Sequence, residues 1–203
     1  MSLKQLKPQI KRLRGFTDSQ AKKFYQSALL CVEAMNTKEF EHRVKNFKWS
    51  GGDKFKMVDI SNAEVYEHIM SGKDKFGWPD GDVDIDATLY FGNDDTIGYT
   101  YATSVRTWIN KKFFFRMSHA EIAGNICHEY LHNCGYNHSY DWNDTIVYTA
   151  PYAVGYMVVD IAKEIYQPSK HSPMKLIRRK VCSGWGPWKK CWYEMVDDEG
   201  KSV

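Results

Sequence analysis

The chain has 203 residues, of which 43% are hydrophobic and 15% aromatic, and its formal net charge is +3. This apolar share excludes a wholly disordered chain, and the length suits one domain with at most a small appendage. The chain has no run of about 18 apolar residues, so no transmembrane helix is predicted. The first 14 residues lack the apolar run of a signal peptide, so we expect a cytoplasmic protein or export by a signal-independent route.

The charge is divided unevenly along the chain. Residues 1–25 hold seven basic residues and one acidic residue, and residues 170–193 hold seven basic residues and no acidic residue. Residues 26–169 hold 13 basic and 20 acidic residues. An acidic body therefore lies between two basic ends, and we expect residues 1–17 to form a solvated arm.

The spacing of apolar residues predicts the first elements of the body. A helical period predicts a helix over residues 18–35, and an alternating pattern predicts a strand over residues 40–49. The segment Ser61-Asn62-Ala63-Glu64 is a capping box that begins a short helix ending near Gly72.

Strict alternation from Asp82 to Phe91 predicts a strand with carboxylates on one face. An EF-hand calcium loop counted from Asp80 would need Gly at its sixth position and Glu at its twelfth. Ile85 and Phe91 stand there, which excludes that loop, although a looser calcium site stays open. Residues 96–102 and 106–115, rich in β-branched and aromatic side chains, predict two further strands.

Two more helices follow in the sequence. Ser118-His119-Ala120-Glu121 is a second capping box, and its helix is expected to run to about Cys134 and end at Gly135. Pro151 is expected to begin a third long helix, which Pro168 ends. The order of elements predicts an α+β fold with a mixed sheet.

A cluster of potential metal ligands lies at the end of the second capped helix. His128 and His132 are four residues apart, so both imidazoles lie on one helix face and can bind the same ion. Gly135 allows a sharp turn that brings His138 back as a third ligand. Three neutral nitrogens leave a fourth position for water, which is typical of a catalytic zinc site. Glu129 points beside the metal, where a general base would take a proton from water.

These residues form the pattern His-Glu-x-x-His-x-x-Gly-x-x-His, and the chain thereby resembles the metzincin clan of zinc metallopeptidases. The resemblance implies one catalytic zinc held by His128, His132 and His138, with Glu129 as the general base. It also implies a twisted mixed sheet with an active-site helix and a C-terminal helix over residues 18–167. Residues 97–101 are similar in position to the clan's edge strand, so Gly98, Tyr99 and Thr100 are expected to bind an extended peptide substrate.

Other clan features are matched less closely. The clan has a methionine-bearing turn after the third histidine, and the candidates are Met157, which falls inside a predicted helix, and Met174, which comes after it. Tyr152 is the tyrosine expected to stabilise the charge that develops on the substrate oxygen, as in some metzincins. Ser139 follows the third histidine, as in the matrixin subgroup.

The C-terminal extension, residues 168–203, combines basic residues with Trp185, Trp188 and Trp192. Such a segment can bind nucleic acid or another polyanion, or dock on the acidic body of the same chain, and we expect docking. Cys182 and Cys191 could pair across a hairpin, but without a secretory context we expect reduced thiols.

The sequence thus predicts a monomeric zinc-dependent metallopeptidase, and more narrowly an endopeptidase, that acts on protein or peptide substrates. Two alternatives remain open. One is a binding module that recognises a partner or polyanion through its C-terminal extension and uses zinc only to hold the fold. The other is an amide hydrolase that acts on cell-wall peptide. Glu129 separates catalysis from a purely structural zinc, because a structural site does not need a general base.

Overall fold

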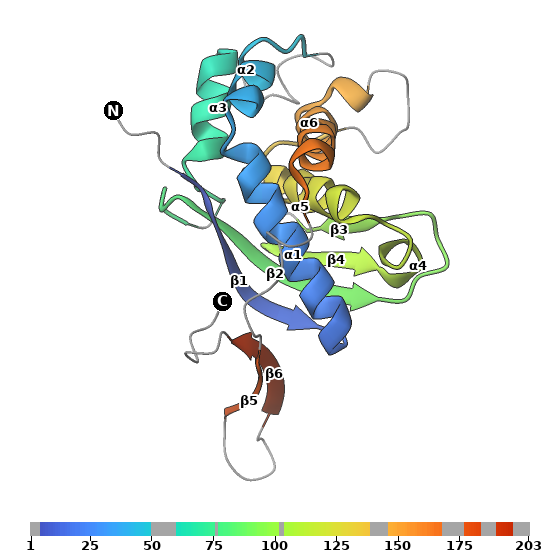
Figure 1. The fold of residues 1–203 in the computed structure, drawn as a ribbon. Coiled ribbons are helices and arrows are strands. Elements are labelled where there is room, and N and C mark those ends of the chain that lie inside the picture. The colour runs from blue at the N-terminus through green and yellow to red at the C-terminus, as the bar shows by residue number, and fades with distance from the viewer. Residues whose placement is uncertain are drawn as a thin grey trace.

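The computed structural model describes residues 5–49, 60–75, 77–101, 104–138, 146–167, 177–183 and 190–196. Within these ranges the fold is α+β, as predicted, with the elements shown in Figure 1. The helices are α1 (Asp18–Met35), α2 (Lys38–Lys45), α3 (Asn62–Met70), α4 (Lys111–Phe114), α5 (His119–Asn133) and α6 (Ala150–Ile165), with a 3-10 helix at Ile146–Tyr148. The strands are β1 (Lys7–Arg14), β2 (Asp82–Tyr90), β3 (Gly98–Thr100), β4 (Arg106–Asn110), β5 (Ile177–Ser183) and β6 (Lys190–Val196).

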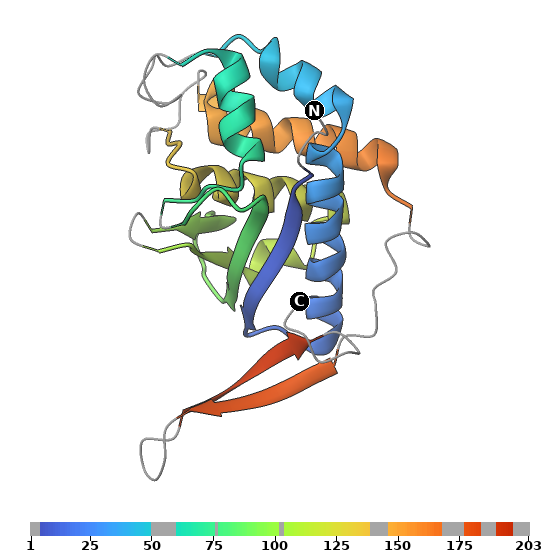
Figure 2. The ribbon, with the colours of Figure 1, turned by 90° about the vertical axis from the view of Figure 1, so that its left-hand side faces the viewer.

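The main sheet is mixed and has the strand order β1-β2-β4-β3 among the described residues. β1, β2 and β4 are parallel, and β3 is antiparallel to β4 at one edge. Helices α1 and α5 lie against one face of this sheet, and α6 packs on α5 (Figure 2). No helix in the described ranges combines the length and the apolar character needed to cross a bilayer.

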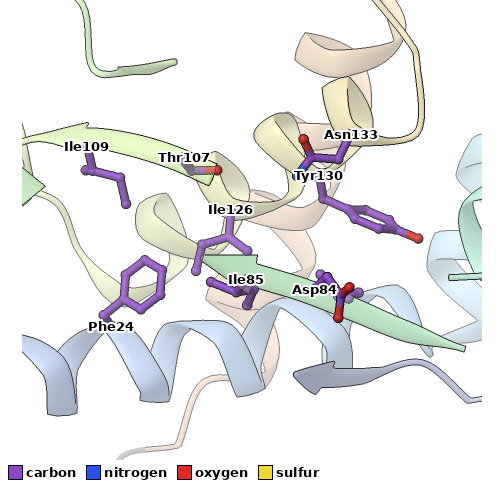
Figure 3. Close-up of a pocket in the computed structure, with 9 residues that line it drawn as sticks. Phe24, Asp84, Ile85, Thr107, Ile109, Ile126, Tyr130 and Asn133 are labelled. Carbon is purple, nitrogen blue, oxygen red and sulfur yellow. The ribbon is translucent and has the colours of Figure 1, made fainter. Parts of the chain in front are cut away.

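The core lies between the sheet and the helices. β2 turns Val83, Ile85, Ala87 and Leu89 inward, each at most 6% exposed, while its carboxylates lie on the other face. A small gap remains in this core, lined from the helices by Phe24, Ile126, Tyr130 and Asn133 (Figure 3). Its α5 residues lie on a different face of that helix from His128 and His132, so the gap belongs to core packing.

Local sequence signals placed several elements correctly. The helix over residues 18–35, the strand that begins at Asp82 and the helix that begins around Pro151 are confirmed. Both predicted capping boxes form: Ser61 with Glu64 and Ser118 with Glu121 satisfy backbone N–H groups of the first helical turns. Cys31, Cys127 and Cys134 are buried free thiols.

The expected solvated arm is wrong for residues 7–14, which form β1. Leu6, Ile10 and Leu13 are at most 8% exposed in the core, and a register shift between Ile10 and Arg12 explains their irregular spacing. On the other face, Lys11 pairs with Asp84 and Arg14 with Asp86. Residues 1–4 lie outside the described residues.

The strand predicted over residues 40–49 is also wrong, because residues 38–45 form α2. Thr37 caps this helix by accepting a hydrogen bond from the Phe40 N–H at 3.1 Å, and Phe40 and Val44 are buried one turn apart. Ion pairs join Glu39 to Arg43 and Glu41 to Lys45 along its surface.

The two later strands are shorter than predicted. β3 covers only 98–100 of the expected 96–102, of which 102 lies outside the described residues. β4 ends at Asn110, where the side chain accepts a hydrogen bond from the Lys112 N–H at 3.0 Å and caps α4. The expected strand to Phe115 therefore becomes a strand followed by one helical turn.

Part of the C-terminal extension forms an antiparallel hairpin of β5 and β6. Cys182 stands directly opposite Cys191 in its register, so the hairpin that the sequence suggested between them is present. Cα atoms of β6 come within 8 Å of β1, so the hairpin approaches the domain at that edge strand (Figure 1). Pro168, Trp185 and Trp188 lie outside the described residues.

Candidate metal centre

The metal-ligand candidates are positioned by the two ends of α5 and the turn that follows it. The Ser118 capping box begins the helix. At the other end, Gly135 adopts φ 96°, a left-handed conformation that strains other residues. The Tyr136 N–H donates back to the Leu131 carbonyl at 3.0 Å, which closes the turn and directs the chain toward His138.

The three predicted histidines come together. One ring nitrogen each from His128, His132 and His138 lies within 4.8 Å of the others, and all three side chains are half-buried. The Nε2 atoms of His132 and His138 are 3.2 Å apart. Three imidazole nitrogens this close can bind one ion, and it is the only such group among the described residues.

Two backbone carbonyls orient the imidazoles. Nδ1 of His132 lies 2.8 Å from the Tyr136 carbonyl, so we assign the proton to Nδ1 and the lone pair to Nε2. His128 hydrogen-bonds to the Pro151 carbonyl at the start of α6. Tyr136 is itself fully buried, and its hydroxyl lies 3.2 Å from Nδ1 of His68 on α3. The hydrogen bonds from His132 and His128 to backbone carbonyls orient the two rings, which prepares these histidines to bind a metal.

Burial favours the neutral form of His128 and His132. It lowers the pKa of His128 well below its ordinary value, and nearby His132 and His138 lower it further. Burial also lowers the pKa of His132 to about 4, against the opposing effect of its hydrogen bond to Tyr136. A neutral imidazole is the form that binds a metal ion.

Glu129 is a buried carboxyl group beside the three histidines. Its side chain is 2% exposed, and its Oε2 atom has no hydrogen-bond partner. Burial raises the pKa of Glu129 to about 8, and the charge of Lys75 works in the opposite direction. Buried polar atoms are nearly always paired, so an unpaired carboxylate oxygen next to three convergent imidazoles fits a bound cation or a functional role.

A close helix crossing brings α6 to the site. A methyl group added at Gly124 would lie 2.8 Å from the Gly155 carbonyl oxygen and 2.2 Å from Cγ2 of Val159. The two helices can approach this closely only because both positions are glycine. As a result, the Tyr152 ring lies 4.6 Å from that of His128 and 4.8 Å from that of His138, between centroids.

The predicted substrate strand lies on the other side of α5. A methyl group added at Gly98 of β3 would be 3.3 Å from Oε1 of Glu129, so this edge strand passes close to the carboxyl group. The Asn110 N–H donates to the Ile97 carbonyl at 2.9 Å, which makes these two residues a hydrogen-bonded pair. By the alternation of antiparallel strands, the N–H and C=O groups of Gly98 and Thr100 then point to the open edge. Tyr99 instead stacks on Trp108 on the outer face, at 5.3 Å between ring centroids.

Other predicted features lie apart from the centre. Met157 is buried inside α6, as its periodicity predicted, and is not in a turn. Met174 and Ser139 lie outside the described residues. The looser calcium site on β2 gains no support, because Asp84 and Asp86 pair with basic side chains of β1, and Asp86 also pairs with Arg106 at 3.4 Å.

Sequence reasoning missed the residues that support the centre through tertiary contacts. His68, Lys75 and Pro151 belong to no metal-binding motif, and only the fold brings them to α5. The one local signal was Tyr136, which lies between Gly135 and His138 within the motif.

No protein-family model matches the chain, and neither the curated proteins nor the solved structures contain a significant match to it. Function must therefore be argued from the residues of the centre. Their donor set fits a divalent transition-metal ion: three imidazole nitrogens, two of them on rings oriented by backbone carbonyls, beside a buried carboxyl group.

Proposed function

We propose that the protein is a zinc-dependent peptidase of metzincin type. The observation that carries this proposal is the convergence of His128, His132 and His138 beside the buried, unpaired carboxyl group of Glu129. A zinc ion held by three histidines supplies Lewis-acid chemistry, which polarises a carbonyl group and makes water more acidic.

Glu129 acts as the general base and then as the general acid. Its carboxylate accepts a proton from the attacking water and returns it to the amine that leaves the peptide. The carboxyl group ionises more readily beside a cation, which offsets the effect of its burial. A structural metal site would not require this buried carboxyl group, and its presence favours catalysis over a binding module.

The surrounding elements bind and position the substrate in this proposal. An extended peptide pairs with the open edge of β3 through the backbone groups of Gly98 and Thr100, which places it beside Glu129. The absence of a side chain at Gly98 lets the peptide and the carboxyl group approach each other. Tyr152, whose ring lies against those of His128 and His138, donates its hydroxyl in this proposal to the oxygen that gains negative charge.

The proposal is tested by metal analysis of the purified chain together with cleavage of a broad peptide library. We expect one zinc per chain and cleavage that a chelator abolishes and zinc restores. A chain that binds no zinc, or that cleaves equally well after chelation, would overturn the proposal. Zinc binding without cleavage, together with salt-dependent polyanion binding, would favour the binding module instead. Cleavage restricted to cell-wall peptide would favour the narrower amide hydrolase.

A further inference from the structure

We propose that Lys75 determines substrate specificity by binding a carboxylate near the scissile bond. The enzyme would then prefer peptides with an acidic side chain within about two residues of the cleaved bond. This inference rests on the proposed peptidase function and adds a substrate class to it.

The backbone around Lys75 is fixed against α5. Lys75 lies in the loop between α3 and β2, and its N–H donates to the carbonyl of Asn133 at 2.8 Å. Asn133 is the last residue of α5, one turn beyond Glu129. The neighbouring loop residue Asp74 is 8% exposed, so this part of the loop packs on the domain.

The side chain of Lys75 reaches the end of β3, where the turn to β4 begins. Its Nζ atom donates to the Tyr101 carbonyl at 2.9 Å, directly beyond the last residue of β3. Thr100, the last residue of β3, in turn lies against α5, with its hydroxyl 3.4 Å from Oδ1 of Asn133. A peptide that pairs with the open edge of β3 would therefore pass the ammonium group of Lys75 at one end of its path.

The charges around the cleft favour an anionic group there. Lys75 is near enough to stabilise the Glu129 carboxylate and to disfavour protonation of His132. Burial lowers the pKa of Lys75, and the carboxylates of Asp74 and Glu129 act to raise it. With a divalent ion in the centre, Glu129 and Asp74 together do not balance the positive charge of the ion and of Lys75, and a substrate carboxylate would be attracted.

The test uses three peptides that share one cleavable sequence. The first has Glu beside the scissile bond, the second has Gln at the same position, and the third has Gln there with a free C-terminal carboxylate close by. Cleavage and equilibrium binding are measured for the parent chain, Lys75→Met and the matched control Lys73→Met, whose exposed lysine lies two residues away.

We expect the parent and Lys73→Met to prefer the Glu peptide over the Gln peptide by about 5- to 10-fold in kcat/KM and in affinity, which corresponds to about 1 kcal/mol. Lys75→Met should abolish this preference, and Lys75→Arg should retain it. A preference for the third peptide over the Glu peptide would overturn the proposal that Lys75 binds an acidic side chain, because it would show that the site binds a terminal carboxylate.

The inference fails if the parent does not distinguish the Glu and Gln peptides, or if Lys75→Met still does. Retention of the preference by Lys75→Arg separates loss of charge from loss of folding in the Met variant. If no peptide is cleaved but the binding preference disappears in Lys75→Met, the peptidase proposal fails while the carboxylate site stands.

Discussion

The metal centre and the outer face of the sheet both contain ionisable side chains from distant parts of the chain, but they differ in how those charges are compensated. On the sheet face, carboxylates of β2 form ion pairs with basic groups of β1, as in Lys11 with Asp84 and Arg14 with Asp86, although Oδ1 of Asp84 is itself buried without a hydrogen-bond partner. In the metal centre, burial favours the neutral imidazoles of His128 and His132, and Glu129 is buried with one oxygen unpaired and forms no ion pair with another described residue.

If the proposed function is right, this difference separates a region that stabilises the fold from one that carries the chemistry. Paired charges near a surface contribute little but cost little, whereas an unpaired buried carboxyl group is destabilising until something compensates it. Such groups are expected where a fold gives up stability for chemistry.

Removing one ligand should nearly abolish zinc binding. In His132→Ala we expect the zinc affinity to fall by about a thousandfold, because one of three ligands supplies roughly a third of a binding free energy of about 10–16 kcal/mol. Calorimetric titration with zinc measures this loss. His42→Ala, at an exposed histidine of α2, should leave the affinity unchanged, and equal losses in both variants would contradict the assignment.

The buried carboxyl group should make the metal-free protein less stable as the pH rises. Folded Glu129 keeps its proton up to about pH 8, whereas in the unfolded chain it ionises near its ordinary pKa of 4.5. The folded state therefore binds more protons between these values, and its free energy of unfolding falls as the pH increases.

Chemical denaturation of the metal-free parent and Glu129→Gln at pH 5 and pH 8 isolates this effect. We expect the parent to lose stability relative to the variant by on the order of 2–4 kcal/mol over this range. Saturating zinc should reduce the difference, because a cation favours the carboxylate. A difference that stays constant with pH would mean that Glu129 is not buried as described.

The crossing of α5 and α6 should tolerate no side chain at Gly124. A methyl group there would lie within 3 Å of Val159 and of the Gly155 backbone, so we expect Gly124→Ala to cost about 1–3 kcal/mol and to weaken zinc binding. At Gly155 the added methyl group would be 3.1 Å from its nearest neighbour, and Gly155→Ala should cost less. Thermal unfolding with and without zinc compares the two, and the reverse order would contradict this packing.

The ion pairs of the sheet face should matter least. Arg14→Ala removes one partner of Asp86, which still lies 3.4 Å from Arg106. We expect a loss of less than about 1 kcal/mol in the free energy of unfolding and no change in zinc affinity. Denaturant unfolding and zinc titration of this variant check both points, and a loss as large as that of Gly124→Ala would show that the two regions do not differ as argued.

The centre could be predicted further from sequence than the sheet because its signals are local. The capping box at Ser118, the helical spacing of His128 and His132, and the turn at Gly135 all act within 21 residues. Periodicity failed where it was short or interrupted: Phe40 and Val44 fit a helix and an alternating strand almost equally well. The bulge in β1 concealed its pattern, and the carboxylates that pair with Lys11 and Arg14 lie more than 70 residues away.

The residues that support the centre could not be predicted from local sequence, because they reach it only through tertiary contacts. Lys75 and His68 reach it only because α3 and the following loop pack on α5, and nothing in their own sequence context indicates a role. Tyr152 could be proposed from its position, but its closeness to His128 depends on the glycine contact between α5 and α6.

The most direct test of the central claim compares the zinc content and the peptidase activity of the parent with those of Glu129→Gln. We predict one zinc per chain in both proteins and a loss of about 10²- to 10⁴-fold in kcat/KM in the variant, because only proton transfer is removed. A Glu129→Gln protein that retains zinc and cleaves peptides as fast as the parent would contradict this claim.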